Sequence, residues 1–240
     1  MAKSVSKAVK EILSNLAYLH FAFENRLANE TAVAKFIKPR VEEKLDFQTS
    51  LGSIIAAVRR YLLTFSPAKK EQNFFELLKS SKLFLRTAVV EVHLKRTRKA
   101  LENLSELEKE IRWARGERMY LLFRTNEITI IADKSHLKEI ISCAPKKDLL
   151  SFNTDRAIIT ILYDPYYFAE SFGGLNFYTG QFAFFGIGIY LIFSTYSATS
   201  FVIHEKDAAS ALKNLSASLN ETAKLYAQNH SQNEKNEKKG

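Results

Sequence analysis

Residues 198–212 read ATSFVIHEKDAASAL and decide the fold, because a strand pattern passes directly into a helix pattern. The apolar run at residues 200–204 is typical of a buried strand. After Glu205, alanine and leucine side chains recur at helical spacing as far as Leu219. Residues 189–195 predict a further strand that pairs with the first. We therefore expect two paired strands followed by a helix in this part of the chain.

The same order of elements is predicted twice along the chain. Residues 157–163 predict a strand, and residues 164–185 predict one helix or two, with a break at Gly173 and Gly174. Earlier in the chain a strand, a helix, two strands, a helix and a short strand are predicted at residues 83–94, 95–112, 119–123, 128–132, 133–142 and 149–152. This is the ferredoxin-like order. The repeat predicts two tandem βαββαβ modules, at residues 83–154 and 155–222.

Residues 1–66 predict a separate domain of small helices. Asn29 is expected to cap a short helix that Pro39 ends or bends, and Thr49 or Ser50 is expected to cap the next one. A connector with a short helix is expected at residues 67–82. Residues 223–240 contain few apolar side chains and predict a disordered tail. The predicted fold class is α+β, with a helical domain followed by two modules.

Charge is distributed unevenly over the 240 residues, whose formal net charge is +9. Residues 1–118 hold 23 basic and 14 acidic residues, whereas residues 119–240 hold 12 of each. A basic first half is consistent with contact to a polyanion, although lysine-rich exposed helices give the same pattern. Residues 171–204 carry no Asp, Glu, Lys or Arg, but glycines and polar residues interrupt them. We therefore expect no membrane-spanning segment.

The sequence offers little catalytic chemistry. Cys143 is the only cysteine, which excludes an intramolecular disulfide and fits a reducing, cytoplasmic location; we expect a buried small side chain there. No secretory signal is evident. The sequence contains no glycine-rich phosphate loop. The five histidines lack the spacing of metal ligands; they are His20, His93, His136, His204 and His230. We expect no enzymatic activity, no metal and no cofactor.

Two sets of short motifs resemble known families. The passage from residue 198 to residue 212, with its Lys-Asp-Ala-x-x-Ala-Leu helix start, resembles the last strand and helix of ACT domains of the aspartokinase type. The front half resembles the archaeal predicted regulators of amino-acid metabolism, which join a helix-turn-helix-like N-terminus to tandem ACT domains. That second resemblance rests on residues 4–9, 29–37, 59–61 and 82–94.

The resemblance implies an amino-acid-responsive regulator of amino-acid metabolism that is a homodimer and binds duplex DNA. Candidate DNA-binding residues are the basic and small polar side chains of two N-terminal helices: Thr31, Lys35, Lys38, Arg40, Ser50, Ser53, Arg59 and Arg60. For an amino acid or similar small ligand the candidates are Asp164, Pro165, Gly173 and Gly174.

Four alternatives remain open at this point. The basic side chains can form an ordinary solvated helix surface. Asp164 can act only as a helix cap, and the aromatic side chains of residues 166–185 can line a pocket or form a packing surface. The alternative function is a regulatory protein without DNA binding that docks onto a biosynthetic enzyme.

Overall fold

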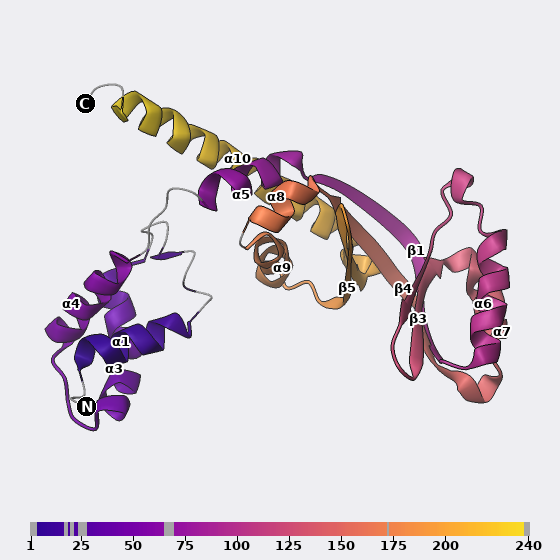
Figure 1. Ribbon diagram of the computed structural model, residues 1–240, viewed down its shortest axis with the longest axis horizontal. Coiled ribbons are helices and arrows are strands. Elements are labelled where there is room, and N and C mark those ends of the chain that lie inside the picture. Colours follow the sequence, from indigo (N-terminus) through magenta and orange to yellow (C-terminus); the bar gives the residue numbers. More distant parts are fainter. Residues whose placement is uncertain are drawn as a thin grey trace. The chain divides into compact units, whose positions relative to one another are not determined.

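The chain divides into two compact units, Met1–Glu71 and Gln72–Gly240. The structure is a computed structural model that describes residues 4–16, 19, 22–23, 28–64, 70–171 and 173–237 (Figure 1). The first unit is helical and the second combines helices with one antiparallel sheet. The expected mixture of helices with an antiparallel sheet is therefore confirmed.

The first unit contains α1 (Val5–Ser14), α3 (Glu30–Leu45) and α4 (Leu51–Leu62). Asn29 caps α3 by accepting a hydrogen bond from the Ala32 amide at 3.0 Å, and Ser50 caps α4 in the same way. The apolar faces of the three helices share one core, whose fully buried members include Val9, Leu13, Ala34, Ile37, Val41, Ile54 and Val58. Amphipathic periodicity thus predicted these helices and their inward faces.

Pro39 does not end its helix, which corrects that part of the expectation, because α3 continues through Pro39 to Leu45. Proline removes one backbone hydrogen bond and costs about 3 kcal/mol within a helix. Here Val33, Ile37 and Val41 form a buried stripe at four-residue spacing on both sides of the proline. Burial of the stripe offsets the lost hydrogen bond, so tertiary packing prevails over local propensity.

A six-stranded antiparallel sheet forms the framework of the second unit, in the order β2-β3-β1-β4-β6-β5. The two central strands, β1 (Lys82–Lys95) and β4 (Leu149–Leu162), have 14 residues each. The outer strands are shorter: β2 (Met119–Phe123), β3 (Glu127–Asp133), β5 (Ile189–Thr195) and β6 (Ala198–His204). Figure 1 shows β1 and β4 running side by side through the unit, with helices packed near both ends.

Each long strand serves both ferredoxin-like modules. Residues 89–95 of β1 are the first strand of module one, and residues 149–153 of β4 are its fourth. In module two the roles are exchanged, because residues 156–162 of β4 come first and residues 82–86 of β1 supply the fourth strand. Each module then has the strand order 4-1-3-2 of the ferredoxin-like arrangement.

Burial along the strands confirms the repeat. The last seven residues of β1 and of β4 show the same succession of four buried positions, a half-buried one, a buried one and an exposed one. The strands β3 and β6 also share one pattern, with five buried residues between half-buried ends. The structure differs from the expected division in one respect: the predicted boundary at residues 154/155 lies inside β4, and residues 83–86 pair within module two.

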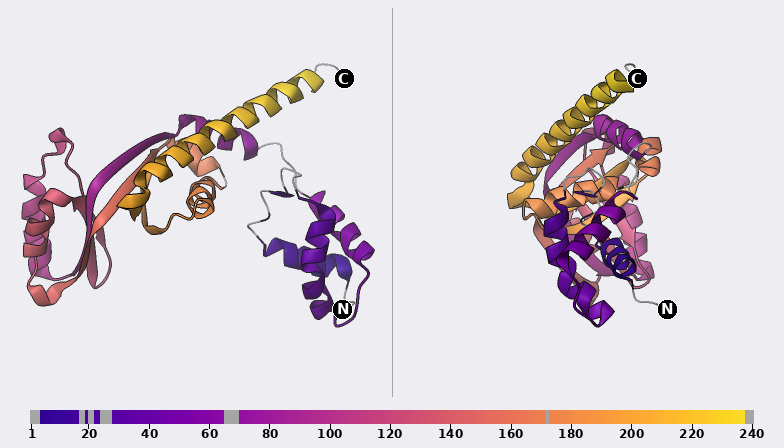
Figure 2. Two further views of the ribbon diagram at one scale, coloured as in Figure 1. Left: turned by 180° about the vertical axis from the view of Figure 1, so that it is seen from behind. Right: turned by 90° about the vertical axis from the view of Figure 1, so that its left-hand side faces the viewer.

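Helices cover one face of each module. In module one, α6 (Arg98–Glu110) and α7 (Leu137–Ser142) share a core with the sheet, centred on Val92, Leu104 and Ile130. In module two, α5 (Lys70–Ser80), α8 (Pro165–Glu170), α9 (Gly174–Phe184) and α10 (Ala208–Glu237) surround a core that contains Leu77, Tyr178 and Phe201. Figure 2 shows the two groups of helices near opposite ends of the long strands.

The expected disordered tail is not what the structure shows, because α10 continues to Glu237. No glycine or proline occurs between Ala208 and Glu237, and alanine, lysine, glutamine and glutamate there favour helix. The low apolar content of the segment after residue 222, from which a disordered tail was expected, therefore did not exclude a helix there. Of the described helices, including α10, none combines the length and the apolar character needed to cross a membrane.

The sheet faces that carry no helices are brought together by curling. Val89, Ile131, Ile158 and Val202 form a small buried cluster drawn from both modules. Tyr120 of β2 and Phe193 of β5 lie on the two outer strands of the sheet, yet their ring centroids are 4.9 Å apart. The curl thus places the two modules' inner faces in contact.

Candidate functional site

The predicted DNA-binding side chains lie on the two helices expected for them. Four are on α3 and two within α4's last turn, while Ser50 caps α4 and Ser53 lies in its first turn. Three of the cations already have protein partners. Arg59 pairs with Glu30 at 2.9 Å, Lys38 pairs with Glu42 at 2.9 Å, and Arg60 donates a hydrogen bond to Ser6.

The two ion pairs, of Arg59 and of Lys38, reduce the positive charge that α3 and α4 present. Arg40 lies 5.8 Å from the ring centre of Phe36, and its cation is therefore partly engaged as well. The Glu30 carboxylate raises the pKa of Arg59 through a hydrogen bond, which keeps that pair charged. These contacts are compatible with the solvated-surface interpretation of the basic side chains.

The predicted ligand residues act in helix formation and packing. Asp164 caps α8 by accepting a hydrogen bond from the Tyr166 amide at 2.9 Å, and Pro165 occupies the first turn. Gly173 adopts a φ of 102°, in the left-handed region that favours glycine, directly before α9. Gly174 is buried, and a Cβ there would lie 2.7 Å from Leu77 Cδ2.

The aromatic segment at residues 166–185 is mainly a packing surface in the described part of the chain. The rings of Tyr163 and Phe168 stack at 4.1 Å, and Phe182 packs against Phe201 at 5.0 Å. Tyr178 is fully buried, and burial raises the pKa of its hydroxyl to about 12. The Tyr178 hydroxyl forms a hydrogen bond with Ser81, so its hydrogen-bonding capacity is used within the protein.

A different set of side chains forms a pocket of about 350 Å³ where β1 crosses from module two to module one. The pocket is lined by residues from β1, the loop before β2 and the end of β3: Arg86, Ala88, Arg115, Gly116, Glu117, Asp133, Lys134 and Ser135. Its volume falls within the range of about 300–1,000 Å³ common for ligand sites. From the sequence, only Asp133 comes into question here, because at the start of a predicted helix in the first repeat it poses the same choice between ligand residue and helix cap as Asp164; the other lining residues were not predicted as site residues.

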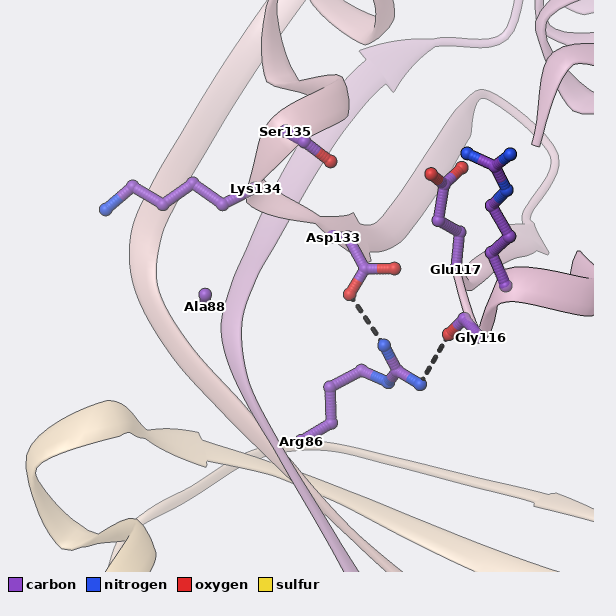
Figure 3. Close-up of a pocket in the computed structure, with 8 residues that line it drawn as sticks. Arg86, Ala88, Gly116, Glu117, Asp133, Lys134 and Ser135 are labelled. Atoms are coloured by element: carbon purple, nitrogen blue, oxygen red, sulfur yellow. Dashed lines mark hydrogen bonds and ion pairs between the residues drawn. The ribbon is translucent and has the colours of Figure 1, made fainter. Parts of the chain in front are cut away.

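Arg86 is the central side chain of this crossing pocket. Its Nη1 donates to Asp133 Oδ1 at 2.8 Å, and its Nη2 donates to the Gly116 carbonyl at 2.8 Å (Figure 3). The other oxygen of Asp133 accepts from the Arg118 amide at 2.7 Å. Arg86 belongs to the strand segment of module two, whereas its partners belong to module one. The guanidinium therefore links the two modules.

Backbone geometry supports this link on both sides. Gly116 has a φ of 87°, which turns its carbonyl toward Arg86 in a conformation that favours glycine. Ala88 has a φ of 54°, which is unusual for a residue with a Cβ. Its amide donates to Glu205 Oε1 at 2.9 Å, at the start of the module-two segment η5 (Glu205–Asp207). The register shift between Arg86 and Val89 lies at this point.

The second carboxylate of the pocket is strongly stabilised as an anion. Glu117 accepts hydrogen bonds from the backbone amide and side chain of Arg112, and its Oε2 lies 3.0 Å from His136 Nε2. These interactions, led by the backbone amide, lower the pKa of Glu117 to about 2. The carboxylate is therefore ionised at every physiological pH.

Sequence reasoning missed this pocket because its residues are distant in the chain. Arg86 and Asp133 are 47 positions apart, and Gly116 is 30 positions from Arg86. One usable signal was the glycine at position 116 between a helix pattern and a strand pattern, since it marks a required turn. Cys143 is buried as expected, and burial raises the pKa of its thiol.

Comparison with known proteins returns structural similarity only. No protein-family model matches the chain, and no curated protein is a significant sequence match. The chain is similar to the ligand-free regulatory subunit of aspartate kinase from Thermus thermophilus, at 14% identity, with a TM-score of 0.45 and coverage of 56% of this chain and 95% of that one.

Two further structures are similar over a comparable share of the chain. Aspartokinase alpha and beta subunits match at 10% identity, with a TM-score of 0.48 and coverage of 60% of this chain and 99% of that one. E. coli aspartokinase III in complex with lysine and aspartate matches at 15% identity, with a TM-score of 0.41 and coverage of 57% and 32%. All three scores are below 0.5, so the ferredoxin-like assignment rests on the strand order and the repeat.

Proposed function

We propose that residues 72–240 form a ligand-sensing regulatory domain of the ACT type, with an amino acid or similar small molecule bound in the crossing pocket. The observation that carries the proposal is the position of Arg86, which reaches from the strand of one module to two groups of the other. A ligand at this point contacts both modules. The sequence resemblance to ACT domains supports the amino-acid class of ligand.

Regulation follows from differential binding to two arrangements of the modules. A ligand that binds one arrangement better than the other shifts the population toward it. The pocket offers a physical basis, because a bound anion competes with Asp133 for Arg86, while Ala88 connects to Glu205 through one hydrogen bond. A partner protein that contacts only one arrangement then responds to the ligand.

A thermal-shift screen of the full chain against the twenty amino acids tests the proposal. A ligand at about 100 times its dissociation constant adds roughly 2.7 kcal/mol, or about 5–10 °C in Tm for a domain of this size. Fluorescence of Trp113, the only tryptophan, reports on the second unit. We expect at least one amino acid to raise Tm, and absence of any shift contradicts the proposal.

Two variants locate the site of any ligand found. Asp133→Asn removes the charge that holds Arg86 and is expected to change the ligand response strongly. Asp164→Asn is the matched control, since asparagine caps a helix as well as aspartate does. Loss of the response in Asp164→Asn alone would place the ligand at the strand-to-helix loop predicted from the sequence instead.

Docking onto a biosynthetic enzyme is the second candidate function, because module two exposes several aromatic side chains. Tyr196 is 86% exposed and Phe184 is 80% exposed, and Tyr190 lies on the outer strand β5. Exposed aromatic side chains are enriched at protein interfaces. We expect a biosynthetic enzyme to co-purify with the wild-type chain in a complex that contains no nucleic acid. The double variant Phe184→Ser/Tyr196→Ser should no longer co-purify with that enzyme.

DNA binding remains a prediction of the sequence, supported by the charge asymmetry of the two halves. Gel-shift binding of the full chain to duplex DNA should weaken steeply with salt if phosphates are contacted. Arg60→Gln is the informative variant, because Arg60 contacts only a neutral serine in the described part of the chain.

We also expect a homodimer in the cytoplasm, which light scattering and fractionation can check.

A further inference from the structure

A basic surface lies at the end of module one where β1 passes into α6. Three segments form it: residues 95–99 after β1, residues 124–127 at the turn between β2 and β3, and η4 (Lys146–Asp148) before β4. They meet because Leu94 of β1 pairs with β3 on one side and with β4 on the other. Neighbouring strands are about 4.8 Å apart, so the strand ends that carry the three segments span about 10 Å. We call these three segments the basic end.

Direct contacts join the three segments of the basic end. The Arg96 amide donates to the Asn126 carbonyl at 3.0 Å, and the Arg96 guanidinium donates to the Arg124 carbonyl at 3.2 Å. Lys95 Nζ lies 3.6 Å from Asp148 Oδ1. Side chains that are distant in the sequence are therefore neighbours on one surface.

The basic end holds more cations than its carboxylates neutralise. Its three segments contain seven basic and two acidic residues. Ion pairs engage Lys95 and Arg124 within the surface, and Arg98 with Glu102 of α6. Among the residues that the structure describes, no carboxylate pairs with the four remaining cations, all of them exposed: Arg96, Lys99, Lys146 and Lys147.

The start of α6 favours an anion at the same place. Thr97 caps the helix by accepting a hydrogen bond from the Ala100 amide at 3.2 Å, and the first turn contains no acidic residue. Arg98 and Lys99 occupy that turn, where the helix macrodipole stabilises anions and disfavours cations. A bound phosphate would be stabilised both by the free amides of the turn and by the cations.

An exposed aromatic ring borders the basic end. Phe123 ends β2 directly before residues 124–127 and is 51% exposed, and the Arg96 guanidinium lies 5.8 Å from the centre of its ring. Proteins that bind single-stranded nucleic acid combine cations that contact phosphates with aromatic rings on which bases stack. Acidic side chains of a protein would engage the cations but would leave the ring without a role.

We propose that the basic end of module one binds single-stranded nucleic acid, with phosphates at Lys99, Lys146 and Lys147 and one base stacked on Phe123. The surface belongs to the second unit, whereas the DNA-binding candidates identified from the sequence belong to the first. It also lies at the opposite end of β3 from the Asp133 of the crossing pocket. The inference therefore does not depend on a regulatory ligand.

Fluorescence anisotropy of a labelled oligothymidylate of about 20 nucleotides, titrated with the full chain at several salt concentrations, tests this inference. The variant Lys99→Gln/Lys146→Gln/Lys147→Gln should weaken binding at least tenfold, because charge-assisted contacts to phosphates are lost. The slope of log K against log salt should become shallower by about 2, since each lost phosphate contact contributes about 0.7 for a single strand.

Three exposed lysines outside the basic end supply the matched charge control, and they lie on α7, η5 and α10: Lys138, Lys206 and Lys213. The variant Lys138→Gln/Lys206→Gln/Lys213→Gln changes the net charge of the chain by the same amount. It should bind the oligothymidylate with an affinity and a salt slope close to those of the wild type.

The role of the ring is tested separately from the charge. Phe123→Leu should weaken binding about fivefold or more and leave the salt slope unchanged, because it removes stacking and no cation. Phe84→Leu is the matched control, since Phe84 is 53% exposed on the module-two part of β1. A duplex of the same length should bind more weakly than the single strand, because its bases are paired and stacked inside.

Several results would overturn the inference. Absence of binding, equal losses in the two triple-lysine variants, or a duplex that binds as tightly as the single strand would each do so. Polyglutamate that displaces the oligothymidylate at equal charge would show that the surface recognises charge alone. If Arg60→Gln abolishes binding while the Lys99→Gln/Lys146→Gln/Lys147→Gln variant binds normally, the nucleic acid contacts the first unit. This inference then fails, whereas the DNA-binding prediction from the sequence stands.

Discussion

The buried ion pair between Glu91 and Arg156 should contribute measurably to the stability of the second unit. Arg156 Nε donates to Glu91 Oε2 at 2.7 Å, and each side chain is only 9% exposed. Glu91 Oε1 lies 3.2 Å from His93 Nε2, and the guanidinium lies 3.6 Å from the centre of the Tyr190 ring. Because β1 supplies Glu91 and β4 supplies Arg156, the pair holds the two shared strands together.

Glu91→Gln keeps the shape of the side chain and removes its charge. Breaking a buried pair from one side costs about 3–5 kcal/mol, and the glutamine oxygen still accepts one hydrogen bond, so we expect about 3 kcal/mol. A loss of that size lowers Tm by about 6–12 °C for a unit of this length. Urea unfolding of the full chain, followed by Trp113 fluorescence, measures the effect.

The double variant Glu91→Leu/Arg156→Leu supplies the control. Replacing both partners of a buried pair by apolar side chains is often neutral or stabilising, so this variant should be more stable than Glu91→Gln. The reasoning is refuted if Glu91→Gln loses less than about 1 kcal/mol, or if the double variant is as unstable as the single one.

Three further predictions concern the same unit. Gly116→Ala should destabilise it by about 1 kcal/mol in urea unfolding, because an alanine is strained at a φ of 87° although no atom lies within 4 Å of its Cβ; unchanged stability would contradict this. Ala88→Gly should stabilise the unit by up to about 1 kcal/mol, since it relieves the φ of 54°; a loss would show that the αL backbone is not strained. The third is a pH dependence: a hydrogen bond raises the pKa of His93 and lowers that of Glu91. The contribution of His93 to the free energy of unfolding is fully present below its pKa in the unfolded chain, about 6.5. It is lost as the pH rises through the raised pKa that His93 has in the folded protein. The contribution of Glu91 to the free energy of unfolding is present above about pH 4.3 and is lost as the pH falls below that value. The Glu91–His93 pair therefore stabilises the fold most near pH 5–6. A His93→Asn variant should therefore lose the wild-type decline in Tm above pH 6.5, and persistence of that decline would contradict the assignment.

The repeated βαββα order was predictable because the strands are short apolar runs between polar segments. The predicted strand at residues 119–123 has the observed bounds, and the break at Gly173 and Gly174 separates α8 from α9 as expected. Each of these features depends on local chemistry, namely strand periodicity and the conformational freedom of glycine.

Continuity of β4 was not predictable from local sequence. The sequence predicted two strands, at residues 149–152 and 157–163, and the residues between them include Asn153 and Asp155, which favour turns. In the structure the Asp155 amide donates to Asn153 Oδ1 at 2.9 Å, so these side chains satisfy local hydrogen bonds while the strand continues through a register shift. The sharing of β1 and β4 between modules follows from long-range pairing, which periodicity does not report.

The pocket could not be predicted for the same reason. Its lining comes from three segments, and the decisive contact joins positions 86 and 133 across two strands. The sequence did indicate Asp164 correctly as a helix cap, which was one of two alternatives left open. A helix cap involves residues that are neighbours in the sequence and can therefore be predicted from it. The crossing pocket depends on how three segments that are distant in the sequence meet in the fold.

Hydrogen–deuterium exchange of the full chain, with and without the amino acid that raises Tm most, tests the central claim most directly. The account predicts slower amide exchange in three separate peptides, which contain residues 86–88, 115–118 and 133–135. Protection confined to residues 164–174, with no change in those three peptides, would contradict the claim that the ligand is sensed where the two modules cross.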